Sequence, residues 1–144
     1  MPDPPYIRRW DGSTAQGTEV RADELALSLA PCELSFIKID HQVRLQFLGV
    51  EVVIESPFVL TAGGIDHQLD PGERGNLGPL LRLYPDHLCT ASVDPDCTLR
   101  LSFDRGATIA VPPDPDYEPW QIVGPGSALV VCMPGESGQL AIWS

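Results

Sequence analysis

The most distinctive group of reactive side chains lies in a proline-rich stretch of the C-terminal half. Residues 112–120 read PPDPDYEPW and place three carboxylates and two aromatic rings on a backbone that proline restricts. Tyrosine and tryptophan bring a large contact area at a small entropic cost, as they do at protein interfaces. The pattern predicts a preorganised acidic surface for a protein partner. Its candidate interaction residues are Asp114, Asp116, Tyr117, Glu118 and Trp120.

The same residues also fit a purely structural interpretation. Trp120 opens an apolar stretch and suits the first core residue of a strand, which would leave Tyr117 to cover the sheet edge. An acidic chain also places carboxylates on exposed loops for solubility alone. Both interpretations stay open at the level of the sequence.

Catalytic signatures are not found along the chain. It contains no phosphate-binding loop, dinucleotide fingerprint, HExxH motif or GxSxG nucleophile elbow. Asp66, His67, Asp70 and Glu73 lie in one stretch, but their spacing does not enforce the convergence that a metal requires. No two cysteines form a CxxC pair, so we expect reduced, mostly buried thiols. The sequence thus predicts a protein that is not an enzyme and has no cofactor or metal.

Charge limits the class of partner. The 144 residues include 20 acidic and 9 basic ones, for a formal net charge of −11. Binding nucleic acid requires cations that displace counterions from phosphates, and anionic membranes also attract basic segments. We therefore expect neither nucleic acid nor a membrane as partner. The N-terminus shows no signal-peptide pattern and no apolar run could span a bilayer, so the expected location is cytoplasmic.

Short apolar alternations punctuated by 13 glycines and 15 prolines predict the fold. We expect one domain over residues 1–144, with residues 1–20 as a loosely held lead-in and residues 32–143 as a β-rich core. The predicted class is mostly β: an antiparallel meander of about eight strands that forms a bent sheet or half-open barrel. One short helix is predicted near residues 79–84, where Pro79 suits a first turn.

Two hairpin registers follow from the alternation. A loop at 40–42 would pair Ile39 with Val43, which keeps the apolar side chains on one face. A three-residue loop at 104–106, with Gly106 in the left-handed position, would pair Leu101 with Ile109. Residues 63–78 are predicted to form the longest loop. Residues 23–30 fit either a short helix or a strand.

Several of these segments resemble a known family. The relevant stretches are LRLSFDRG (99–106), VPPDPDYEPW (111–120), VEVVIESPF (50–58), PG (134–135) and LAIW (140–143). They are similar to small actinobacterial proteins of unknown function with a D-G-T-L-x-L-x-F-x-D-G-T hairpin, a Y-E-x-W motif and a closing G-x-L-A-x-W strand. The likeness covers most of residues 32–143. The chain departs at Cys97 (family Gly), Arg105 (family Asp) and Gly106-Ala107 (family Gly-Thr). The resemblance implies the fold and no catalytic residue or ligand.

Two functions follow as expectations. The first is an acidic protein-interaction module that neutralises a basic partner, as immunity proteins and antitoxins of similar size and charge do. The second is a small-molecule binding module whose ligand lies in the mouth of the sheet near residues 63–78. The oligomeric state does not follow from the sequence.

Overall fold

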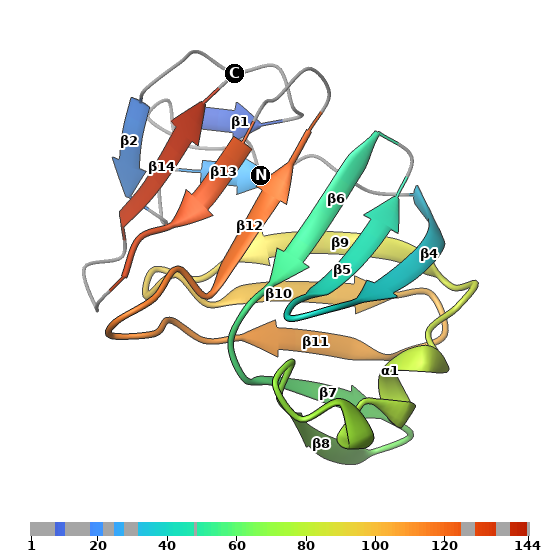
Figure 1. The fold of residues 1–144 in the computed structure, drawn as a ribbon. Helices are drawn as coiled ribbons and strands as arrows, with labels where there is room; N and C mark the ends of the chain where they lie inside the picture. The colour runs from blue at the N-terminus through green and yellow to red at the C-terminus, as the bar shows by residue number, and fades with distance from the viewer. Residues whose placement is uncertain are drawn as a thin grey trace.

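The computed structural model describes residues 8–10, 18–21, 25–27, 32–47, 49–124, 129–134 and 139–143. Within them, twelve strands form one antiparallel sheet that bends back on itself (Figure 1). The prediction of a mostly β, antiparallel fold is confirmed, although the strands outnumber the eight that were predicted. The extra strands include one short segment near the N-terminus and one in the stretch expected to be a loop.

One half of the sheet carries the site described below. Its strands, in spatial order, are β2 (Thr18–Arg21), β14 (Gln139–Trp143), β13 (Leu129–Cys132), β12 (Trp120–Val123), β6 (Val50–Ile54), β5 (Val43–Phe47) and β4 (Cys32–Ile39). The other half continues with β9 (His87–Val93), β10 (Leu99–Phe103), β11 (Thr108–Val111), β7 (Phe58–Ala62) and β8 (Ile65–Leu69). Outside this sheet, β1 (Arg8–Trp10) pairs in parallel with β3 (Leu25–Leu27).

Strand β4 joins the two halves. Most of β4 pairs with β5, while its first two residues pair with Leu88 and His87 of β9. The register of β4 shifts between Leu34 and Phe36, which turns Leu34 into the core and leaves Phe36 half exposed. Bulges of this kind bend a strand, and the bend folds one half of the sheet over the other.

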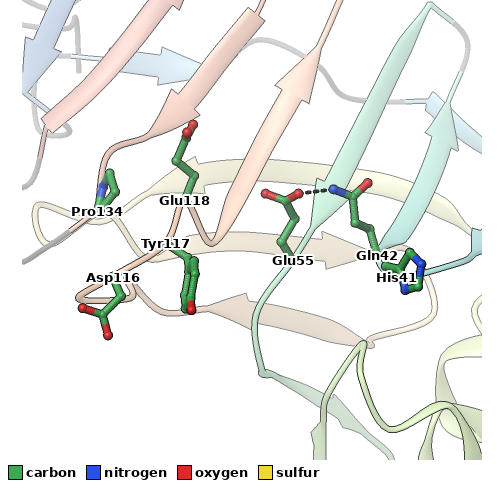
Figure 2. Close-up of a pocket in the computed structure, with 7 residues that line it drawn as sticks. All are labelled: His41, Gln42, Glu55, Asp116, Tyr117, Glu118 and Pro134. Carbon is green, nitrogen blue, oxygen red and sulfur yellow. Dashed lines mark hydrogen bonds between the residues drawn. The ribbon is translucent and has the colours of Figure 1, made fainter.

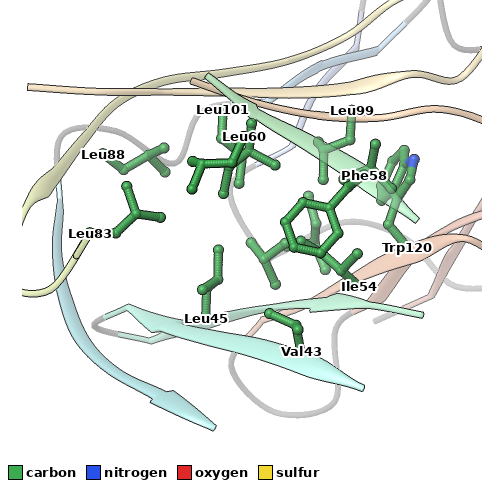
Figure 3. Packing of buried hydrophobic residues seen from close by; sticks show 14 of the residues in the cluster. Val43, Leu45, Ile54, Phe58, Leu60, Leu83, Leu88, Leu99, Leu101 and Trp120 are labelled. Atoms are coloured by element: carbon green, nitrogen blue, oxygen red, sulfur yellow. The ribbon is translucent and has the colours of Figure 1, made fainter. Parts of the chain in front are cut away.

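The hydrophobic core lies between the facing halves (Figure 3). Val43 and Leu45 of β5 point towards Leu99 and Leu101 of β10, and all four are fully buried. The alternation in the sequence produces this packing, because successive side chains of a strand point to opposite faces. Burying each large aliphatic side chain contributes about 1.5–3 kcal/mol.

Both predicted hairpin registers are confirmed. Ile39 pairs with Val43 across the turn at 40–42, and Leu101 pairs with Ile109. Gly106 has φ +95°, and the Phe103 N–H donates to the Ala107 carbonyl at 2.9 Å. Glycine adopts this left-handed conformation without the steric cost that a Cβ brings.

The turn between β9 and β10 has the same hydrogen bonds with a different residue in the left-handed position. The Asp94 N–H donates to the Thr98 carbonyl and the Cys97 N–H donates to the Asp94 carbonyl, both at 2.9 Å. Cys97 has φ +76°, where the resembling family carries glycine. Its side chain is buried, so the strained position is held by core packing.

One sequence expectation needs correction. Residues 63–78 are not one long loop, because Ile65–Leu69 form β8 against β7. Gly63 and Gly64 both have positive φ, which permits a tight hairpin turn that the alternation did not reveal. The predicted lead-in of residues 1–20 contains β1 and β2, and β2 pairs with β14. The rest of that segment lies outside the described residues.

The remaining elements are short. A 3₁₀ turn (Arg74–Asn76) precedes α1 (Gly78–Leu81), which agrees with the helix predicted after Pro79. Leu80 anchors α1 in the core. Residues 25–27 form a strand, which decides between the two readings of that segment. Among the described residues, no helix is long and apolar enough to cross a membrane.

Candidate functional site: an acidic groove at four strand ends

A groove of about 500 Å³ opens where four neighbouring strands begin or end. It lies beside the start of β5, the end of β6, the start of β12 and the end of β13. Figure 2 shows its two walls: one comes from the proline-rich loop before β12, the other from the β4–β5 turn and the end of β6. The lining residues are His41, Gln42, Glu55, Asp116, Tyr117, Glu118 and Pro134.

Strand pairing brings the two walls together. Trp120 pairs with Ile54, and Ile54 also pairs with Val43 on its other side. The Glu55 N–H then donates to the Pro119 carbonyl at 2.8 Å, which continues the ladder past the end of β6. Residues about 75 positions apart, such as His41 and Asp116, therefore line one groove.

The loop wall is fixed by a side-chain cap. Oδ1 of Asp114 accepts hydrogen bonds from the Asp116 N–H at 2.9 Å and from the Tyr117 N–H at 3.0 Å. Bonds of this kind replace backbone pairing in turns and hold the loop in one conformation. The Tyr117 side chain stands 70% exposed on this fixed loop. A large aromatic side chain presented in this way loses little entropy when it is covered.

The opposite wall is organised by a polar network on the outer face of the sheet. Gln42 donates through Nε2 to Glu55 and accepts through Oε1 from Arg44, while Arg44 Nη1 donates to Glu51 Oε1 at 3.0 Å. The Gln42–Glu55 bond is visible in Figure 2. Because the guanidinium is held by Glu51, the network orients Glu55 without bringing a cation to it.

The β4–β5 turn places the one histidine of the groove. The Gln42 N–H donates to Oδ1 of Asp40 at 2.8 Å, and this bond holds the pKa of Asp40 below its ordinary value. The backbone N–H of Asp40 in turn donates to the Gln42 carbonyl at 3.0 Å. This closed turn leaves the His41 side chain exposed at the mouth of the groove.

The electrostatic character of the groove is acidic. Within the described part of the chain, no lysine or arginine forms an ion pair with Glu55, Asp116 or Glu118. Three carboxylates without a cation around one concave surface attract positive charge, and low-dielectric walls concentrate that field. The arrangement suits the ammonium or guanidinium groups of a partner.

The structure separates the five candidate residues predicted from the sequence. Asp116, Tyr117 and Glu118 line the groove. Asp114 supports their loop through its hydrogen bonds. Trp120 is fully buried, and its Nε1–H donates to the Cys97 carbonyl at 2.9 Å, so it is a core residue and cannot contact a partner.

A comparison with known families places the chain. Residues 25–144 match a family described as a family of unknown function (DUF6188). The chain belongs to this family. No curated protein and no solved structure matches it. The expectation that the chain belongs to a family of unknown function is thereby confirmed.

In this DUF6188 chain, sequence reasoning missed half of the groove. His41, Gln42 and Glu55 carry no motif, because nothing in their spacing shows that their turn would meet residues 116–118. The alternation did predict the strands that end there. The site is thus a consequence of sheet order, which local patterns do not encode.

Three thiols of the DUF6188 chain, those of Cys89, Cys97 and Cys132, belong to the described side chains. Cys89 is exposed, and its Sγ donates to Oδ1 of Asp104 at 3.7 Å. Partial desolvation, followed by the Asp104 charge, raises the pKa of Cys89. The hydrogen bond between the buried Cys97 and Cys132 thiols lowers the pKa of Cys97 and raises that of Cys132. Among the described side chains, no group of three or more potential ligands could hold a metal ion.

Proposed function

We propose that this protein is a non-enzymatic interaction module whose acidic groove binds a basic protein partner. The observation that carries the proposal is the exposed Tyr117, held on a capped loop beside Glu55, Asp116 and Glu118. Interface energies concentrate on aromatic anchors with a charged surround, and complementary charge raises the association rate. An immunity- or antitoxin-like neutraliser has this chemistry, because its carboxylates occupy the positions that a basic partner uses for phosphates.

The net charge of −11 supports the same proposal at long range. An acidic surface steers a cationic partner and repels nucleic acid and anionic membranes, so we propose a protein as the partner. The proposed location is the cytoplasm, and the proposed source is actinobacterial, as the motif resemblance implies.

The test compares two double variants with the same change in charge. Asp116→Lys with Glu118→Lys reverses the groove, whereas Glu33→Lys with Glu73→Lys reverses exposed carboxylates elsewhere. Asp114 is left intact because its substitution would also release the loop. Each protein is used to capture partners from a lysate of its own host at low and moderate salt, and the captured protein is then purified for calorimetry.

We expect a basic protein that binds the wild type and the Glu33/Glu73 variant at low salt and is lost from the Asp116/Glu118 variant. Tyr117→Ala should weaken binding about tenfold or more, as for an aromatic hot spot. Equal binding by the Asp116/Glu118 variant would contradict the proposal, since the groove would then not be the contact surface.

A second candidate function has one specific observation in its favour. The small-molecule module is expected near residues 63–78, and a partly open pocket lined by Gly63, Ile65 and His67 lies at this place. It is separate from the acidic groove, because the two share no lining residue.

A further inference from the structure

The second pocket has a volume of about 270 Å³ and lies between the β7–β8 hairpin, α1 and the β10–β11 turn. Its apolar floor is formed by Leu60, Leu83 and Ala107, all of them buried. This volume equals the liquid share of about nine water molecules, so only a small molecule fits. Small-molecule sites combine such an apolar floor with a few polar groups that fix orientation.

Two arginines stand among the polar side chains of this pocket, in a chain that is acidic as a whole. Arg82 and Arg105 both line it, together with His67. Among the described residues, Arg44 and Arg100 are each paired with a carboxylate, whereas no ion pair occupies Arg82 or Arg105. Arg82 directly follows α1 and Arg105 lies in the β10–β11 turn, so two exposed arginines from different segments line one pocket.

A buried carboxylate sets the charge balance. Asp86 is 4% exposed, and its oxygens accept from the His87 N–H at 2.7 Å and from the Arg105 N–H at 3.3 Å. These bonds hold Asp86 on backbone donors, and no ion pair among the described residues involves either guanidinium group. Two guanidinium charges against one carboxylate give the pocket an excess of one positive charge, which matches a monoanion.

We propose that this pocket binds a small monocarboxylate with an apolar body. The planar arginine fork pairs with the carboxylate, and the apolar body covers Leu60, Leu83 and Ala107. A phosphate ester fits less well, because its second charge would exceed the charge of the pocket. This inference rests on the second candidate function and specifies its ligand class.

The experiment uses three probes of one shape: 3-phenylpropionate, 3-phenylpropanamide and 3-phenylpropylamine. Each is titrated to about 10 mM into the ¹⁵N-labelled full chain, with amide shifts followed in two-dimensional NMR spectra. A ligand of this size is expected to bind with a dissociation constant of about 1 mM. We expect the carboxylate to shift the amides of Gly63, Arg105 and Ala107, and to bind at least fivefold more tightly than the amide.

Arginine variants test which side chains recognise the carboxylate of the ligand. Arg82→Gln and Arg105→Gln should each weaken binding of 3-phenylpropionate about fivefold, and the backbone N–H of residue 105 remains to hold Asp86. Arg100→Gln is the matched control, because Arg100 lies on β10 outside the pocket and should leave binding unchanged.

The possible results distinguish failure of the carboxylate inference from failure of the small-molecule function on which it rests. Equal binding of acid and amide at these residues would overturn the carboxylate inference and leave a small-molecule site. Shifts confined to Tyr117 and Glu118 would also overturn it, since the ligand would then occupy the acidic groove. No shift with any probe would overturn both the ligand class and the second function.

Discussion

Tyr117 and Trp120 show how backbone placement decides what a side chain does. The two aromatic residues stand three positions apart in the sequence, yet the tyrosine is 70% exposed while the tryptophan is fully buried. Trp120 is the first residue of β12 and pairs with Ile54, which directs its ring into the core. Tyr117 precedes the strand, where the Asp114 cap holds it outward. The sequence left both placements open for these two residues.

Gly106 provides a clean test of conformational strain at one residue. A Cβ built there meets no atom within 4 Å, and φ is +95°. Gly106→Ala should therefore lower the free energy of unfolding by about 1–2 kcal/mol through backbone strain alone. The measurement is urea denaturation at equilibrium.

Gly75→Ala is the control for this substitution. Gly75 has the same open surroundings without a positive φ, so alanine there should leave stability unchanged or raise it slightly. Similar losses in both variants would refute the strain argument for Gly106.

At the scale of elements, the turn between β9 and β10 depends on a second carboxylate cap. The Thr98 N–H donates to Oδ1 of Asp96 at 2.9 Å, and this bond is the main cause that lowers the pKa of Asp96. A carboxyl group with a lowered folded pKa stabilises the protein above its unfolded pKa of about 3.9. That stability is lost as the pH falls through the folded pKa.

Asp96→Asn should make unfolding less sensitive to acid. The asparagine oxygen can still accept the Thr98 bond but carries no charge to lose. Between pH 5 and pH 2, the wild type should lose more stability than the variant, by under about 1 kcal/mol because the site is exposed. Denaturation curves at several pH values measure the difference.

Asp116→Asn is the control for Asp96→Asn, since the Asp116 carboxylate caps no turn among the described residues. It therefore measures the effect of an Asp-to-Asn change that removes no cap. If Asp96→Asn loses as much stability between pH 5 and pH 2 as the wild type does, the cap does not contribute through its charge.

Some elements follow from the sequence and others do not, for identifiable reasons. Gly106 and the alternation around it define the β10–β11 register, because only one loop length keeps the apolar residues on one face. The bulge after Leu34 has no such marker, since both Leu34 and Phe36 are apolar and only the partner strands decide which one is buried. The sequence predicted one wall of the acidic groove, because the loop before β12 has a distinctive composition. It did not predict that this loop would lie opposite His41, because that depends on the order of the strands.

At the scale of the whole molecule, two electrostatic effects oppose each other. The formal charge of −11 produces self-repulsion in the folded state, whereas ion pairs such as Arg44–Glu51 and Arg100–Asp94 are attractive. Exposed ion pairs each contribute about 0–1 kcal/mol. At 10 mM salt the screening length is about 30 Å, so the excess charges interact across the molecule. The repulsion should therefore be the larger effect.

Sodium chloride should consequently stabilise the fold while it weakens capture of a basic partner. Raising it from 10 to 200 mM should increase the melting temperature by about 3 °C, which corresponds to about 1 kcal/mol for a chain of this size. The Glu33→Lys/Glu73→Lys variant changes the formal net charge from −11 to −7 and should show a smaller increase. A melting temperature that falls with salt would mean that the ion pairs outweigh the repulsion. If salt raises the melting temperature and weakens capture of the partner, the excess negative charge favours binding and opposes folding stability.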